Sequence, residues 1–151
     1  MDKKYEKKYE YFKMLAGMYI NAWHDVKECY EELRDEIEES AEARKAGLFE
    51  LCKAIDITIP EDYVVEETDR LIEDAKEAIE NVNYVYEDDE KTLQNLADTI
   101  HAVDLSINSM MDGVRLVRKY KSIEDDGINR LDIAICMLPY IGDIKEKWRD
   151  Y

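Results

Sequence analysis

The feature that most constrains the fold is a run of apolar, mostly aromatic residues over the first quarter of the chain. Its members alternate at steps of three and four and comprise Tyr5, Tyr9, Phe12, Ala16, Tyr19, Trp23, Val26, Tyr30, Leu33 and Ile37. This spacing keeps the side chains on one face of an α-helix. It predicts one helix from near Lys3 to near Glu39, roughly 55 Å long at ~1.5 Å per residue. Such a helix exceeds the width of a compact domain of 151 residues. We therefore expect it either to bend or to meet a partner beyond its own domain.

The remainder of the chain carries further helical stripes. They predict a short helix at 48–55, an extended connector at 56–60, and helices at 61–86, 93–120, 128–138 and 141–148. Asp88 or Asp89 is expected to cap the helix that begins near 91. Five glycines and two prolines are too few for the turns of a many-stranded sheet. We predict an all-α fold, a single helical bundle over residues 1–151 with four main helices, short additional ones and an unusually long first helix.

The composition limits the classes of partner that the chain can bind and indicates its cellular compartment. Acidic residues number 37 and basic residues 21, for a formal net charge of -16, which opposes direct binding to nucleic acid or to an anionic membrane. The start of the chain lacks the apolar stretch of a signal peptide, and the longest apolar run, 133–141, is too short to span a bilayer. The cysteines Cys29, Cys52 and Cys136 are odd in number and far apart, as expected of free thiols in a reducing compartment. We expect a cytoplasmic protein.

The negative charge is concentrated on one predicted helix. Residues 61–90 hold thirteen acids against Arg70 and Lys76. In the heptad register of that helix, six carboxylates fall on the face turned away from the core: Glu66, Glu67, Glu73, Asp74, Glu77 and Glu80. Over residues 66–80 they average one carboxylate per ~3.7 Å of the axis, a linear charge density near that of a DNA strand with one phosphate per ~3.4 Å. The pattern predicts a docking face for a basic protein partner; the alternative is an acidic face that is simply solvated.

Size and charge suggest a sharper form of this prediction. An acidic face with the charge spacing of a nucleic-acid strand can occupy the basic site of a nucleic-acid-binding machine and inhibit it. Small acidic inhibitors that phages direct against host enzymes act in this style, and the comparison is an analogy of charge and size. A second predicted docking area is the aromatic end of the first helix, at Tyr5, Tyr9 and Phe12, where tyrosine favours either a partner or self-association as a homodimer.

Motifs for catalysis are sparse. The register turns His24 and His101 outward, and the sequence has neither a glycine-rich phosphate loop nor a nucleophile motif. We therefore predict no catalytic residue, no metal site and no cofactor, and expect a non-enzymatic acidic protein that acts as an inhibitor.

One alternative comes from a resemblance. The segment Glu38-Glu39-x-x-Glu42, followed by Glu66-x-x-Asp69, resembles the motif of all-α nucleoside-triphosphate pyrophosphohydrolases of the MazG type. In that family the carboxylates hold magnesium ions that neutralise the substrate phosphates. The resemblance covers residues 38–69 and implies a magnesium-dependent hydrolase. The heptad register nevertheless turns the first three of these carboxylates outward.

Overall fold

The computed structural model describes residues 3–46, 63–121, 126–136 and 138. The described part contains five helices and no strand: α1 (Lys3–Glu32), α2 (Arg34–Lys45), α3 (Val65–Glu80), α4 (Asp89–Lys121) and α5 (Asp126–Cys136). The predicted all-α bundle with four main helices and a long first helix is confirmed. The helices expected at 48–55 and 141–148, the connector at 56–60, Cys52 and Pro139 lie outside the described residues. None of the described helices is long and apolar enough to cross a membrane.

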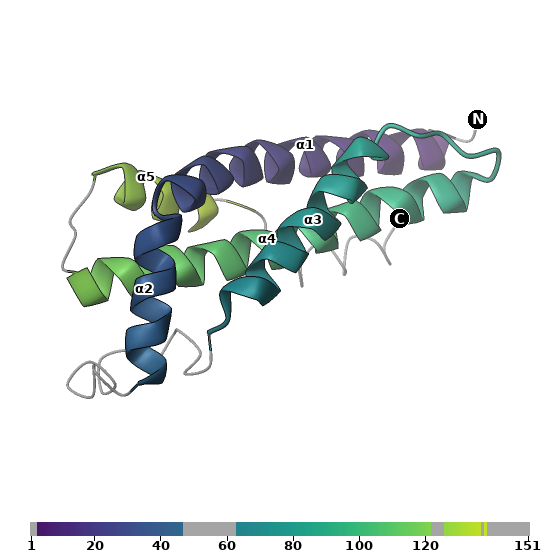
Figure 1. Cartoon of the computed structure of the whole chain (residues 1–151). Coiled ribbons are helices and arrows are strands. Elements are labelled where there is room, and N and C mark those ends of the chain that lie inside the picture. Colours follow the sequence, from purple (N-terminus) through teal and green to yellow (C-terminus); the bar gives the residue numbers. More distant parts are fainter. Residues whose placement is uncertain (1–2, 47–62, 122–125, 137, 139–151) are drawn as a thin grey trace.

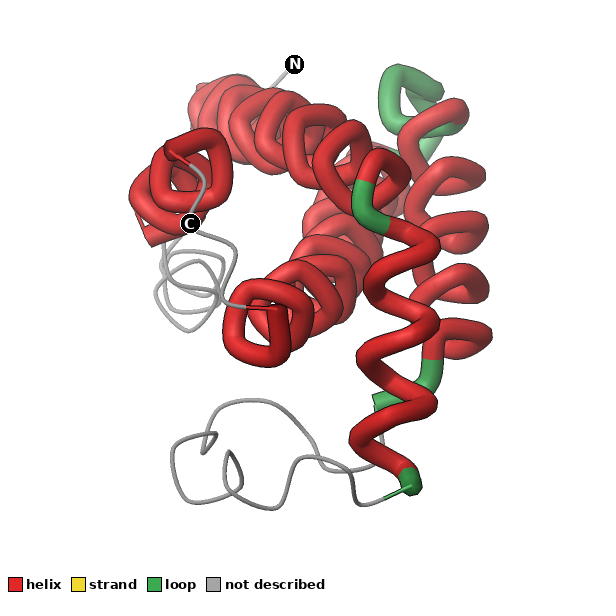
Figure 2. Tube along the Cα trace, turned by 60° about the vertical axis from the view of Figure 1, so that its left-hand side comes forward, coloured by secondary structure: helices red, strands yellow, loops and turns green. Residues whose placement is uncertain are grey.

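The two longest helices, α1 and α4, lie side by side along the length of the bundle (Figure 1). They run parallel, because Tyr5 lies near Asp89 at one end and Trp23 bonds to Ser106 farther along. Helix α3 returns in the opposite direction against α4, and α5 packs on α1 (Figure 2). This order leaves α3 covered on one side only, so its other face is turned to solvent.

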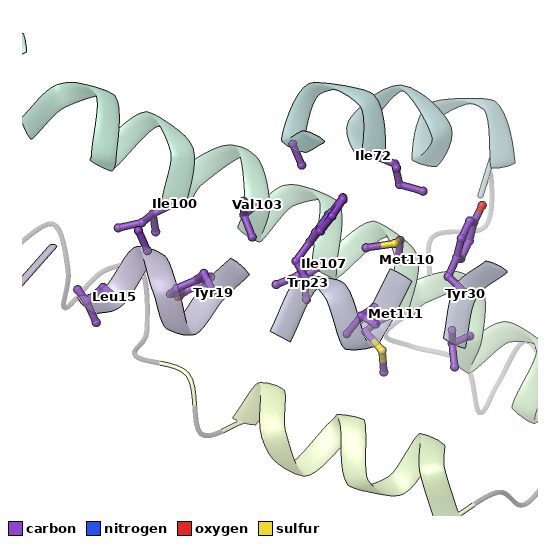
Figure 3. Packing of buried hydrophobic residues seen from close by; sticks show 14 of the residues in the cluster. Leu15, Tyr19, Trp23, Tyr30, Ile72, Ile100, Val103, Ile107, Met110 and Met111 are labelled. Carbon is purple, nitrogen blue, oxygen red and sulfur yellow. The ribbon is translucent and has the colours of Figure 1, made fainter. Parts of the chain in front are cut away.

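The buried face of α1 is the face that the sequence predicts. Phe12, Ala16, Tyr19, Trp23, Val26 and Tyr30 are all buried. They meet a stripe of α4 that includes Ile100, Val103, Ile107, Met110 and Met111, with Ile72 of α3 closing the cluster (Figure 3). Within this core the indole Nε1 of Trp23 donates a hydrogen bond to Ser106 Oγ at 2.9 Å. The only polar atom of the largest core side chain is thereby paired, as burial requires.

The prediction of one unbroken helix to Glu39 was wrong. The first helix ends at Glu32, and Leu33, with φ −100° and ψ 7°, joins it to α2, which leaves at a steep angle (Figure 1). Backbone hydrogen bonds continue across the bend, from Leu33 N–H to Cys29 O (3.1 Å) and from Ile37 N–H to Leu33 O (2.8 Å). The bend lets Ile37 reach the core, where it is 0% exposed, and places α2 against α4. Of the two outcomes expected for an overlong helix, the bend is the one observed.

The limits of α3 also differ from the prediction. The helix spans Val65–Glu80 instead of 61–86, since Val64 is extended and Asn81 ends the helix. Tyr86, predicted as the last residue of this helix, is exposed in the loop that follows. The start of α4 agrees with the prediction of an acidic cap, because Asp88 Oδ1 accepts the N–H of Glu90 at 3.0 Å. Helices α4 and α5 lie within a few residues of their predicted positions.

Candidate docking face

Helix α3 has two sharply different sides. Its inner residues Val65, Thr68, Ile72 and Ala75 are buried. The six acidic residues of the predicted docking face are all exposed: Glu66, Glu67, Glu73, Asp74, Glu77 and Glu80. We call these six the acidic face. Because α4 covers only the inner side of α3, the acidic face lies on the outside of the bundle.

The charge on the acidic face is only partly compensated. Arg70 lies 3.6 Å from a carboxylate oxygen of Glu67 and 3.5 Å from one of Asp74. Within the described part of the chain, the other four acids of the face make no ion pair. Like charges three or four residues apart, such as Glu73 and Glu77, repel by a few tenths of a kcal/mol per pair. A cationic surface placed against this face relieves that repulsion.

The aromatic end of α1 is less exposed for docking a partner than the sequence suggests. Phe12 is 0% exposed and belongs to the core, so its predicted role in docking is corrected. Tyr5 and Tyr9 are partly buried and stack with ring centroids 5.9 Å apart. The start of α4 lies beside this end of α1: burial, and to a smaller extent the carboxylate of Asp89, raise the pKa of the Tyr5 phenol. The first helix therefore does not overhang its own bundle, since the parallel α4 accompanies it.

The two halves of the pyrophosphohydrolase-like motif do approach each other, but around an arginine. Arg34 binds both carboxylate oxygens of Asp69, at 2.5 and 2.6 Å, and lies 3.4 Å from an oxygen of Glu38. The hydrogen bonds to Asp69 are the main reason that the pKa of Arg34 is raised. The remaining acids of the motif, Glu39, Glu42 and Glu66, are exposed. The sequence interpretation missed Arg34, which pairs with two of the five carboxylates of the motif, Glu38 and Asp69.

Neither histidine lies in a site that can hold a metal. His24 and His101 are exposed, as their register predicts. Among the described residues, no group of three or more His, Cys, Asp or Glu side chains is arranged to hold a metal ion.

A further exposed surface lies just after the end of α3, in a segment that the sequence predicted to be helical. In the loop between α3 and α4, Tyr84, Val85 and Tyr86 are 60%, 65% and 38% exposed. The two tyrosine rings meet edge to face, with centroids 4.6 Å apart. The signal that could have separated them from the inner stripe is the pair Asn81 and Asn83, which favours a turn.

Comparisons of this chain with protein-family models, with curated proteins and with solved structures gave no match. The acidic face and the loop beside it are therefore interpreted from their own geometry and charge.

Proposed function

We propose that this chain is a non-enzymatic interaction protein that docks the acidic face of α3 on a basic surface of a protein partner and blocks that surface. The observation that supports the proposal is the set of four exposed carboxylates, Glu66, Glu73, Glu77 and Glu80, without an ion pair in the described part of the chain. They project from a helix whose opposite side is fixed in the core. A rigid helix presents charges in a constant geometry, so the partner does not have to order them on binding.

The expected partner is a protein that binds nucleic acid. Its binding groove is lined with basic side chains placed to meet phosphates about 3.4 Å apart along a strand. The carboxylates of the acidic face average about one per 3.7 Å of the helix axis, a linear charge density close to that of such a strand. The chain as a whole is strongly acidic, with a net charge of -16, which accelerates the approach to a basic groove. Binding of this kind excludes the nucleic acid and makes the chain a competitive inhibitor.

The test uses a charge-reversed variant, E66K/E73K/E77K/E80K, and a control with the same change in net charge on another surface. The control is E10K/D25K/E28K/E32K, whose four acids are exposed on α1. Proteins of the native host are bound to DNA-coated beads and eluted with each purified protein. We expect the wild type and the control to release the same DNA-binding protein, and the charge-reversed variant to bind that protein more than about tenfold more weakly.

Two results would contradict the proposal. One is release of the same protein by the charge-reversed variant with unchanged affinity, provided that its circular dichroism shows the native helix content. The other is failure of the wild type to release any protein from the beads. Raising the salt concentration is expected to weaken the binding steeply, because exposed charges are screened within about 10 Å at 0.1 M.

A further inference from the structure

The loop between α3 and α4 exposes three consecutive apolar residues, Tyr84, Val85 and Tyr86. We call these three residues the aromatic loop. Scattered exposed apolar side chains are common on soluble proteins, whereas a contiguous group of them marks a surface that binds. Tyrosine is also among the residues that contribute most strongly to protein interfaces.

The aromatic loop is held in place at both ends. On one side, the N–H of Tyr86 donates to Thr92 Oγ1 at 2.9 Å, and Thr92 itself is 2% exposed in α4. On the other side, the carbonyl oxygen of Asn81 accepts from Asn95 Nδ2 at 2.8 Å and from the N–H of Tyr84 at 3.1 Å. The two rings are therefore presented in a defined position, and a partner that binds them loses little loop entropy.

The acidic residues on both sides of the aromatic loop favour a positively charged binding partner. The loop follows directly on the end of the acidic face, at Glu77 and Glu80, and is followed by four more acids, Glu87, Asp88, Asp89 and Glu90. All six are exposed. A cation that approaches the rings therefore meets carboxylates on both sides. A second copy of this chain, with its own net charge of -16, is repelled.

One natural side chain matches both features. The guanidinium of arginine is planar and weakly hydrated, so it stacks on an aromatic ring while it donates hydrogen bonds to a carboxylate. The ammonium of lysine is compact and strongly hydrated, which makes it a poorer partner for a ring. We propose that the aromatic loop is the anchor of the docking surface and that it selects arginine side chains of the basic protein partner. This inference rests on the proposed function and deepens it.

The test measures selectivity with two defined probes, fluorescein-labelled nonaarginine and nonalysine peptides, by fluorescence anisotropy at low salt. The loop variant is Y84S/V85S/Y86S, in which the backbone bond to Thr92 is retained. The matched control is M14S/M18S/L105S, which removes exposed apolar side chains from α1 and α4. Circular dichroism verifies the helix content of each variant.

We expect the wild type and the control to bind the arginine peptide more tightly than the lysine peptide. The loop variant should reduce this ratio by about fivefold or more, because it loses the ring contacts and leaves the carboxylates in place. Its affinity for the lysine peptide should stay within about twofold of the wild type. An unchanged ratio in the loop variant overturns the inference, as does a wild type that self-associates through these residues, seen as a dimer that the loop variant converts to monomer.

The charge-reversed variant separates this inference from the proposed function. If the acidic face contributes the charge, E66K/E73K/E77K/E80K weakens both peptides together and preserves their ratio. If that variant binds both peptides like the wild type, the acidic face is not the docking surface, whatever the loop does. If the charge-reversed variant weakens both peptides but the loop variant leaves the ratio of arginine to lysine affinity unchanged, the docking role of the acidic face is retained. The proposed arginine selectivity of the aromatic loop is then wrong.

Discussion

Gly113 of α4 lies against Tyr63 and Ile37, and replacing this glycine by alanine tests the junction directly. A Cβ at this position would lie 2.6 Å from Tyr63 Oη, 3.1 Å from Tyr63 Cζ and 3.2 Å from Ile37 Cγ2. The tyrosine is not free to move away, because its hydroxyl lies 2.8 Å from Thr68 Oγ1, which is itself 2.7 Å from Ser109 Oγ. Gly113→Ala is therefore expected to displace the ring and break its hydrogen bond to Thr68.

The expected effect is the sum of two opposing contributions. Alanine in a helix interior is more stable than glycine by about 0.5–1 kcal/mol. Overpacking of a well-filled site costs about 1–3 kcal/mol, and the lost hydrogen bond costs about 1 kcal/mol more. The net result is a loss of about 1–3 kcal/mol. Gly17 is the matched control, since it lies inside α1 with no atom within 4 Å of its Cβ position. Gly17→Ala should stabilise the protein by about 0.5–1 kcal/mol.

The assay is urea unfolding followed by circular dichroism. With a slope of about 1–3 kcal/mol per molar urea, a loss of 2 kcal/mol lowers the midpoint by about 1 M. The variant Y63F removes the oxygen that lies 2.6 Å from the added methyl group, so Gly113→Ala should cost less in that background than in the wild type. If Gly113→Ala is as stable as Gly17→Ala, the described contact between Tyr63 and α4 is wrong.

Two further predictions concern buried polar groups. Ser106→Ala leaves the buried indole N–H of Trp23 without its acceptor and should cost about 1–3 kcal/mol in the same urea assay, while a loss below about 0.5 kcal/mol would mean that the N–H finds another acceptor. Burial raises the pKa of Tyr19 to about 12. The unfolded chain loses this proton near pH 10, so the stabilising effect is complete below pH 10 and is lost as the pH rises toward 12. Tyr19→Phe should therefore show a shallower alkaline decline of the unfolding free energy, and an identical decline in both proteins would refute the assignment.

The face that α1 buries was predictable because helical periodicity alone determines which side chains share a side. The bend at Leu33 was not, because its cause lies in contacts between distant segments. The pattern places Ile37 on the apolar stripe but does not show which segment it packs against, and the bridge from Arg34 to Asp69 of α3 leaves no trace in it. The same holds for the end of α3. The apolar spacing continues from Ile79 to Tyr86, but hydrogen bonds from α4 hold the chain in a loop.

Part of the candidate site was also predictable from the sequence, and part of it was not. Exposure of the acidic face followed from the register of α3, since the partner helix needs only one side of it. The availability of the aromatic end of α1 depended on what lies beside it, and no local pattern shows that the first and fourth helices run parallel. That arrangement brings Asp89 to Tyr5 and leaves Phe12 in the core. Spacing in the sequence thus predicts which residues share a helix face. Which neighbouring helix packs on that face depends on the tertiary fold.

In the proposed complex, the acidic face and the aromatic loop would serve different steps of binding. Exposed carboxylates act over roughly 10 Å and mainly accelerate the encounter with a basic partner. The exposed rings of Tyr84 and Tyr86 act only in contact and mainly slow dissociation. Because the loop follows the last turn of α3 and is bonded to α4, both features occupy one rigid unit. Under the proposed function, such a surface would attract many basic proteins but retain those that offer arginine where the rings lie, and this difference would make the inhibition selective.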